Sequence, residues 1–200
     1  MLNKLDTTSI LEKLEKEIQH TTELLKAGKT ILYPTDTIWG IGCDASNSSA
    51  IKRIYEIKKR EDHKSLIILL DDINKLNLYV VKVPDIAWEI VEYSELPLTV
   101  IYPKGKNVAP ELMGEDGSIA IRITKDVFCK KLIYKLGKPL VSTSANISGE
   151  AFNGNFSDIS EEIKKNTDYI VNYRQEEKIK ATPSRIIQLG LDGEFKFIRK

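Results

Sequence analysis

Residues 65–70, SLIILL, constrain the fold of this 200-residue chain more than any other stretch. The five residues after the serine are all aliphatic, so no position among them is suited to face water. A strand of this composition is typical of a sheet whose two faces are both covered by other elements. The run therefore predicts a strand that is buried on both sides.

Helical and strand patterns alternate in the first part of the chain, and strands adjoin in the last part. Apolar residues recur at helical spacing in residues 9–29, 48–60, 84–94, 126–137 and 157–166. Strand patterns occupy residues 30–34, 65–70, 97–102, 118–123, 138–142 and 168–173, and residues 184–200 predict a hairpin. This order predicts an α/β fold with a mixed sheet flanked by helices. The length suits one domain spanning residues 1–200.

The charges nearly balance, with 30 Lys and Arg against 29 Asp and Glu. A strongly basic coat for nucleic acid is thereby excluded, although a local basic patch is not. Cys43 and Cys129 do not form a CxxC pair, and the two histidines lack neighbours with metal-ligand spacing, so we expect no disulfide scaffold and no tightly bound metal. We find no signal core and no apolar run long enough to span a bilayer, which predicts a cytoplasmic protein without a membrane partner.

Two stretches place polar residues where an element ends. In residues 33–44, YPTDTIWGIGCD, hydroxyls and a carboxylate follow a strand, and glycines let backbone approach a ligand. The alternative is an ordinary exit from the sheet. In the KKR motif, Lys58 and Arg60 stand between a helix and the next strand, where a fixed pair of cations could hold phosphates. For Lys59 a solvated helix end is the better interpretation.

Arg122 interrupts an otherwise apolar strand, residues 118–123. A buried arginine is costly unless it is paired. Two interpretations stay open at this point. The arginine is either one partner of a structural ion pair or a clamp for a carboxylate or phosphate.

Residues 138–150, KPLVSTSANISGE, run from a short apolar strand into a series of hydroxyls. No GxSxG motif is present, so these side chains are interpreted as ligand donors and not as nucleophiles. A plain turn is the alternative. Along an extended backbone, Ser142, Ser144 and Asn146 should point to one side, and Thr143 and Ala145 to the other.

Together these stretches resemble the YrdC family of threonylcarbamoyl-AMP synthases, also called TsaC. The family pattern of PTDT-x-YG-x-G, K-x-R, an Arg-terminated strand and S-x-N reads here as PTDTIWGIG, KKR, SIAIR and SAN, in that order. The resemblance extends from about Leu11 to Arg199 and corresponds to the short form, without the extra C-terminal domain. It implies a twisted mixed sheet with a large, concave, positively charged cavity. Trp39 replaces the usual tyrosine, and Arg185 replaces a threonine of the late STVVD motif.

The resemblance also implies a reaction. L-threonine, bicarbonate and ATP would give threonylcarbamoyl-AMP and pyrophosphate, which makes the chain a nucleotidyltransferase. A separate downstream transferase would use the product to modify the tRNA adenosine next to the anticodon. Mg²⁺ is expected to accompany ATP, and tRNA or double-stranded RNA are further candidate ligands. The alternatives are a non-catalytic paralogue that binds RNA or a nucleotide, and a plain structural domain.

The family's site residues carry over to positions of this chain as follows. Lys58 and Arg60 would be catalytic and neutralise the triphosphate and the leaving pyrophosphate. The threonine site would comprise Thr35, Arg122, Ser142 and Ser184. The ATP site would comprise Lys58, Ser118, Ser144, Asn146 and Arg199. The division of Ser142, Ser144 and Asn146 between the two substrates stays open, and residues 173–183 are the candidate lid over ATP.

Overall fold

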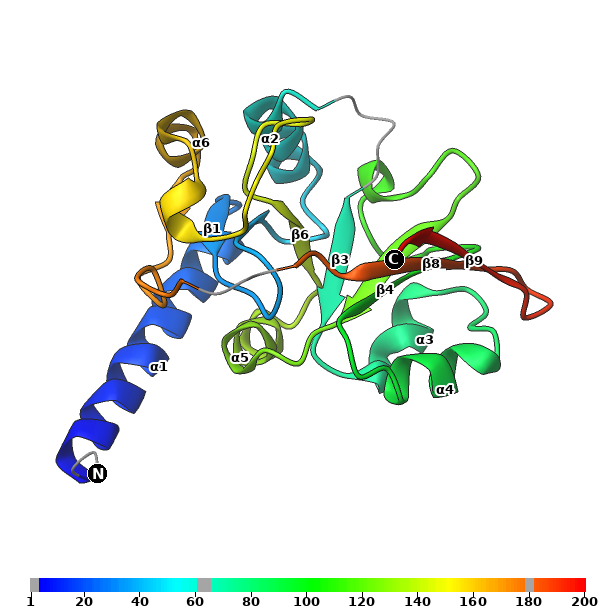
Figure 1. The fold of residues 1–200 in the computed structure, drawn as a ribbon, viewed down its shortest axis with the longest axis horizontal. Helices are drawn as coiled ribbons and strands as arrows, with labels where there is room; N and C mark the ends of the chain where they lie inside the picture. Colours follow the sequence, from blue (N-terminus) through cyan, green and yellow to red (C-terminus); the bar gives the residue numbers. More distant parts are fainter. Residues whose placement is uncertain (1–3, 61–65, 179–181) are drawn as a thin grey trace.

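The computed structural model describes residues 4–60, 66–178 and 182–200. Within them a nine-stranded mixed sheet has the order β7-β1-β2-β6-β3-β5-β4-β8-β9, with helices packed around it (Figure 1). The strands are β1 Ile31–Tyr33, β2 Gly40–Gly42, β3 Ile67–Leu70, β4 Leu98–Tyr102, β5 Ile119–Ile123, β6 Leu140–Ser144, β7 Tyr169–Ile170, β8 Arg185–Leu189 and β9 Phe195–Arg199. The helices are α1 Lys4–Lys26, α2 Ser48–Lys58, α3 Leu76–Tyr79, α4 Ile86–Glu92, α5 Val127–Leu136 and α6 Glu161–Asn166, and short 3₁₀ turns cover Ile73–Lys75, Pro110–Leu112 and Phe156–Asp158. The predicted fold class is confirmed.

Strand β3 lies in the middle of the sheet, parallel to β5 and antiparallel to β6. Ile68 and Leu70 belong to the larger core, whereas Leu69 belongs to the second core on the opposite face. Both faces of the SLIILL strand are therefore buried, as its composition predicted.

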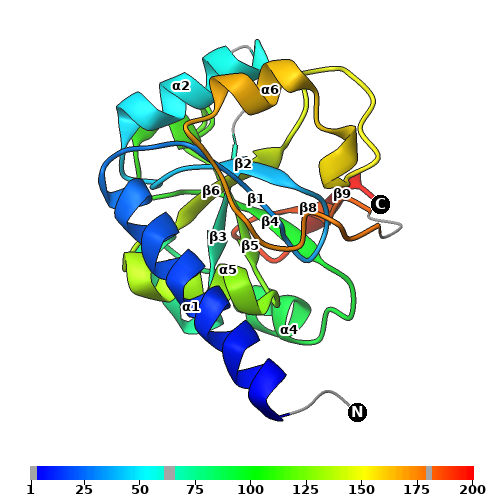
Figure 2. The same ribbon diagram turned by 90° about the vertical axis from the view of Figure 1, so that its left-hand side faces the viewer.

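Different helices cover the two faces of the sheet (Figure 2). The larger core includes apolar residues of α2 and α6 together with those of α3 and α4. The second core is formed by α1 and α5 against Leu69, Leu140 and Tyr33. The α5 helix begins at Asp126, whose carboxylate accepts the Cys129 N–H, and ends at Gly137 in the left-handed conformation. These caps determine where the α5 helix, which packs against the sheet, begins and ends.

The α1 helix follows its predicted apolar spacing but packs along only part of its length. Ile18 and Leu25 are fully buried, whereas Ile10 and Leu11 are 53% and 56% exposed. The N-terminal end of the helix projects away from the sheet in Figure 1, which explains the difference. Helical periodicity predicted the helix correctly but not the extent of its contact with the domain. No helix in the described residues is long and apolar enough to cross a bilayer.

Gly42 is required by the close approach of β2 to its neighbours, and its replacement supplies a prediction. A methyl group there would lie 2.7 Å from the Tyr33 ring and even closer to the Val141 carbonyl oxygen. Because backbone cannot move aside cheaply, we expect Gly42→Ala to destabilise the fold by about 3 kcal/mol. Gly40→Ala is the matched control, since its methyl group would meet nothing closer than 3.2 Å. Urea unfolding of both variants measures this, and equal midpoints would contradict it.

Candidate functional site

A row of side chains crosses the sheet on the face that carries the α5 core. Backbone register pairs Leu69 with Arg122, Arg122 with Thr99, Thr99 with Ile186, and Ile186 with Arg199. Directly paired residues of neighbouring strands project to the same side of a sheet. The five side chains, from five strands, therefore share one face.

A cavity of about 220 Å³ opens over part of this row, at Arg122, Ile186 and Arg199. Its cations are Arg60, Arg122 and Arg199, its hydroxyl-bearing residues are Thr37, Ser142, Thr143, Ser144 and Ser184, and its apolar residues include Ile38, Leu66, Ile67 and Ile186. No carboxylate occurs among the lining residues of the described chain. Guanidinium groups and hydroxyls in such a setting favour an anionic ligand that is rich in oxygen.

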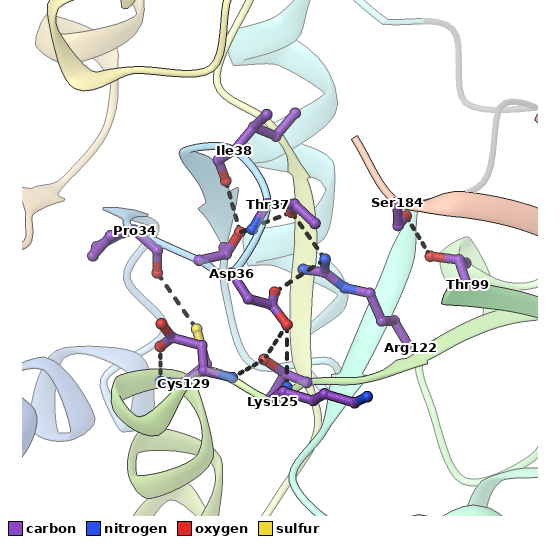
Figure 3. A network of polar contacts seen from close by, with 12 residues as sticks. Pro34, Asp36, Thr37, Ile38, Thr99, Arg122, Lys125, Cys129 and Ser184 are labelled. Carbon is purple, nitrogen blue, oxygen red and sulfur yellow. Dashed lines mark hydrogen bonds and ion pairs between the residues drawn. The ribbon is translucent and has the colours of Figure 1, made fainter. Parts of the chain in front are cut away.

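Arg122 is 2% exposed and lies in a network of polar contacts (Figure 3). Its Nη1 donates to the Thr37 hydroxyl at 2.8 Å and lies 3.1 Å from a carboxylate oxygen of Asp36. The other Asp36 oxygen accepts the Lys125 N–H at 3.1 Å. The ion-pair interpretation of Arg122 is therefore correct, with Asp36 as the acid. Because Arg122 also lines the cavity, the clamp interpretation stands beside it.

The PTDT turn presents Thr37 to the cavity and not Thr35, the residue that the sequence indicated. Thr35 Oγ1 accepts the Thr37 N–H at 3.0 Å, donates to the Ile38 carbonyl at 2.8 Å and lies 2.9 Å from the Thr37 hydroxyl. Thr35 is not among the lining residues, whereas Thr37 is. Thr37 lines the cavity in place of Thr35 because the Thr35 side chain hydrogen-bonds back to its own loop.

Lys58 is buried behind the cavity wall, with 1% of its surface exposed. Its ammonium donates to the carbonyl oxygens of Ser144 and Asn146 at 2.5 and 2.6 Å, and to the Asn146 side-chain oxygen at 3.3 Å. Burial, with a contribution from the charge of Arg60, lowers the pKa of Lys58 to about 7. Lys58 was expected to face the phosphates. In the structure it instead fixes the SAN loop, and Arg60 is the KKR residue that lines the cavity.

The STSAN stretch only partly follows the predicted alternation. Ser142 and Ser144 line the cavity, and Ala145 is buried in the larger core on the other face, as expected. Thr143 also contributes to the lining, but it pairs with Ile41 of the larger core, so its side chain lies on the other face as expected. Asn146 is not among the lining residues. The β6 strand ends at Ser144, and beyond it the Asn146 amide turns to donate to the Glu150 carbonyl at 2.7 Å.

Ser184 and Arg199 form one side of the cavity. The Ser184 hydroxyl lies 2.8 Å from that of Thr99, and Arg199 donates twice to the Ser184 carbonyl, at 2.9 and 2.7 Å. Burial, and then the charge of Arg122, lowers the pKa of Arg199 below its usual range. Arg122 and Arg199 line the same cavity, and their charges repel one another there, which indicates a place for an anion.

Ser118 lies outside the lining residues, immediately before β5. Its N–H donates to the Asp116 carboxylate at 2.9 Å, and its carbonyl accepts the Gly114 N–H at 2.8 Å. Sequence reasoning missed Asp36, Thr37 and Thr99. The first two lie inside the PTDT motif, which could have pointed to them, whereas Thr99 has no local signal in its apolar strand.

Sequence comparisons place relatives over nearly all of the chain. The profile of the Sua5, YciO and YrdC family, described as "Telomere recombination", matches residues 23–200. A threonylcarbamoyl-AMP synthase of Pseudoalteromonas translucida is 40% identical over 129 residues, which are 63% of this chain and 69% of the relative. A putative threonylcarbamoyl-AMP synthase of Methanocaldococcus jannaschii is 34% identical over 192 residues, or 96% of this chain and 86% of the relative.

Solved structures show the same fold. Sua5 of P. abyssi, complexed with L-threonine, aligns with a TM-score of 0.76 and 26% identity over 86% of this chain. This chain spans only half of that protein, because the alignment covers 50% of the longer chain. YciO of E. coli aligns with a TM-score of 0.80 and 24% identity over 92% of this chain and 89% of that one.

Proposed function

The chain belongs to the Sua5, YciO and YrdC family, and from this premise we propose that it is a threonylcarbamoyl-AMP synthase. It would combine L-threonine, bicarbonate and ATP into threonylcarbamoyl-AMP and pyrophosphate, and would thus be a nucleotidyltransferase. One observation carries the proposal. The buried Arg122, paired with Asp36, lines a cavity that also contains Arg60 and Arg199 but no acid among its described lining residues.

The chemistry requires no protein nucleophile. The threonine amine takes up bicarbonate with loss of water and becomes a carbamate. A carbamate oxygen then attacks the α-phosphorus of ATP, and the bond to the leaving pyrophosphate breaks. Catalysis of such a step comes from positioning the reactants and from stabilising the charge on the phosphates. A cavity lined by arginines and hydroxyls suits this task.

Within this proposal each cation has its own role. Arg122, next to Thr37 and on the same face as Ser142, would bind the threonine carboxylate. Arg60 and Arg199 would face the phosphates of ATP. Lys58 would hold the Ser144–Asn146 loop in place through its three acceptors and would not contact substrate directly.

Mg²⁺ remains part of the proposal only as a partner of ATP. Mg²⁺ prefers oxygen ligands such as carboxylates and phosphates. The described lining of the cavity offers no carboxylate, and no cluster of three potential metal ligands exists among the described residues. These residues do not fit a protein-held Mg²⁺ site, so the phosphates and water would supply its ligands.

The wider setting follows from the same proposal. The product would pass to a transferase that modifies tRNA next to the anticodon, in the cytoplasm.

Thr35, Ser118 and Asn146 remain candidate contacts for substrate. Direct binding of tRNA or double-stranded RNA is not required by the chemistry, and the near-neutral net charge of +1 gives it little electrostatic support.

The proposal is tested by incubating purified protein with ATP, L-threonine and bicarbonate. We expect pyrophosphate release that depends on threonine, and threonylcarbamoyl-AMP in the mass spectrum. Reactions without threonine are the matched control. Absence of the product, together with RNA binding that is tighter than ATP binding and weakens steeply with salt, would instead support the non-catalytic paralogue.

A further inference from the structure

Arg174 joins three parts of the chain behind the cavity. Its Nη1 lies 2.7 Å from Asp126, its Nε lies 2.6 Å from Glu177, and its Nη2 is 3.5 Å from the Thr35 carbonyl oxygen. Its backbone has a φ of 58°, in the left-handed region that side-chain-bearing residues adopt reluctantly. A strained residue of this kind persists only where its surroundings hold it. Its contacts with Asp126 and Glu177 join the side chain at this position to its surroundings.

Two chains of contacts run from Arg174 to Arg122. The first passes through Thr35, whose hydroxyl lies 2.9 Å from that of Thr37, which in turn accepts from Arg122. The second passes through Asp126, which follows directly on Lys125. The Lys125 N–H holds the Asp36 carboxylate that pairs with Arg122 (Figure 3).

The space between Arg174 and the PTDT turn is small. Arg174 and Glu177 close a space behind Thr35 and Trp39 that measures only about 10 Å³, roughly the volume that one water molecule needs. Tyr173 stacks on Phe128 with ring centroids 5.5 Å apart, which anchors the same segment. The first residues of the candidate lid, 173–183, are therefore tied down, and residues 179–181 of that segment lie outside the described chain.

We propose that Arg174 is a positioning residue for Arg122. It holds the PTDT turn and the Asp36 carboxylate so that the Arg122 guanidinium keeps its orientation toward the cavity. This inference rests on the proposed function only for the identity of the ligand, the threonine carboxylate. The contacts that carry it do not depend on that identity.

The test compares Arg174→Met and Arg174→Lys with Arg53→Met. Arg53 is a matched control because it also pairs with a glutamate three residues later and donates to a distant carbonyl, but on the outer face of α2. We expect Arg174→Met to raise KM for threonine about tenfold, because the Arg122 guanidinium would be displaced from the threonine carboxylate. The KM for ATP should stay within about twofold of the wild-type value. Arg174→Lys keeps a cation for Asp126 and should recover part of the loss. Arg53→Met should change neither constant.

Hydrogen–deuterium exchange on the same variants separates this inference from the proposed function. Arg174→Met should speed exchange in residues 34–42 and 124–130, and Arg53→Met should not. If the wild-type protein makes no product, the proposed function fails, and the exchange result alone decides on Arg174. Unchanged exchange, or equal increases of both KM values as general loosening would cause, would overturn the inference. If Arg174→Met does not fold, Arg174→Lys carries the same comparison, with smaller expected changes.

Discussion

Replacing Arg122 with alanine is expected to lower kcat/KM for threonine by about 10³-fold, the scale set by loss of one charged donor in a water-poor site. The buried guanidinium would bind the threonine carboxylate, and no other described lining residue on its strand carries a charge. Arg122→Lys keeps the charge but loses the planar fork, so we expect it to recover only part of the activity. The measurement is the rate of pyrophosphate release over a range of threonine concentrations.

The same substitution leaves Asp36 without its cation. Removing one partner of a buried ion pair costs up to about 3–5 kcal/mol, and the Asp36 side chain is only 17% exposed. Part of the activity loss could therefore reflect unfolding, so circular dichroism and ATP affinity are measured alongside. Arg185→Ala removes an exposed arginine from the neighbouring part of the sheet and is the control. A folded Arg122→Ala protein with a normal KM for threonine would remove Arg122 from the threonine site.

Replacing Lys58 with methionine is expected to lower turnover by about 10²-fold, the scale of a small misplacement of groups at a reacting centre. Methionine preserves much of the side-chain volume but leaves the oxygens of Ser144 and Asn146 without their donor. The loop that carries Ser144 would then lose its fixed position. Lys52→Met is the control, since Lys52 lies on the same helix but is exposed and pairs with Glu111. Turnover equal to that of the control would exclude the positioning role of Lys58.

The pKa of Lys58 gives this variant a second readout. Burial lowers the pKa to about 7 in the folded chain, from 10.5 as the ordinary value. Between these two pH values the unfolded chain binds one more proton than the folded chain, so the burial of Lys58 carries a cost in stability that is absent above the upper value and grows as the pH falls toward 7. We therefore expect the stability of the wild type to rise with pH relative to Lys58→Met from pH 7 to 10. Parallel unfolding midpoints over this range would show that Lys58 does not titrate there.

Local patterns predicted most of the elements because each depends on nearby residues, but they did not predict β2 or α3. The aliphatic run of β3, the Asp126 cap and the Gly137 stop of α5 are all visible within a few positions of the chain. The site residues were harder to assign. Thr35 and Thr37 differ only in which hydroxyl folds back onto the loop, and Lys58 differs from Arg60 only in which side chain is buried. Neither distinction has a local signature.

The sequence by itself determined the α/β elements, the family, and the supply of arginines and hydroxyls from which a site could be built. Only the tertiary structure decided which of them meet. Strand register, set by backbone hydrogen bonds between distant segments, aligns Arg122, Thr99, Ile186 and Arg199 in one row. The pairing of Arg122 with Asp36 arises in the same way, since a turn after β1 is brought against β5. Such contacts join residues far apart in the chain, so no local pattern of residues encodes them.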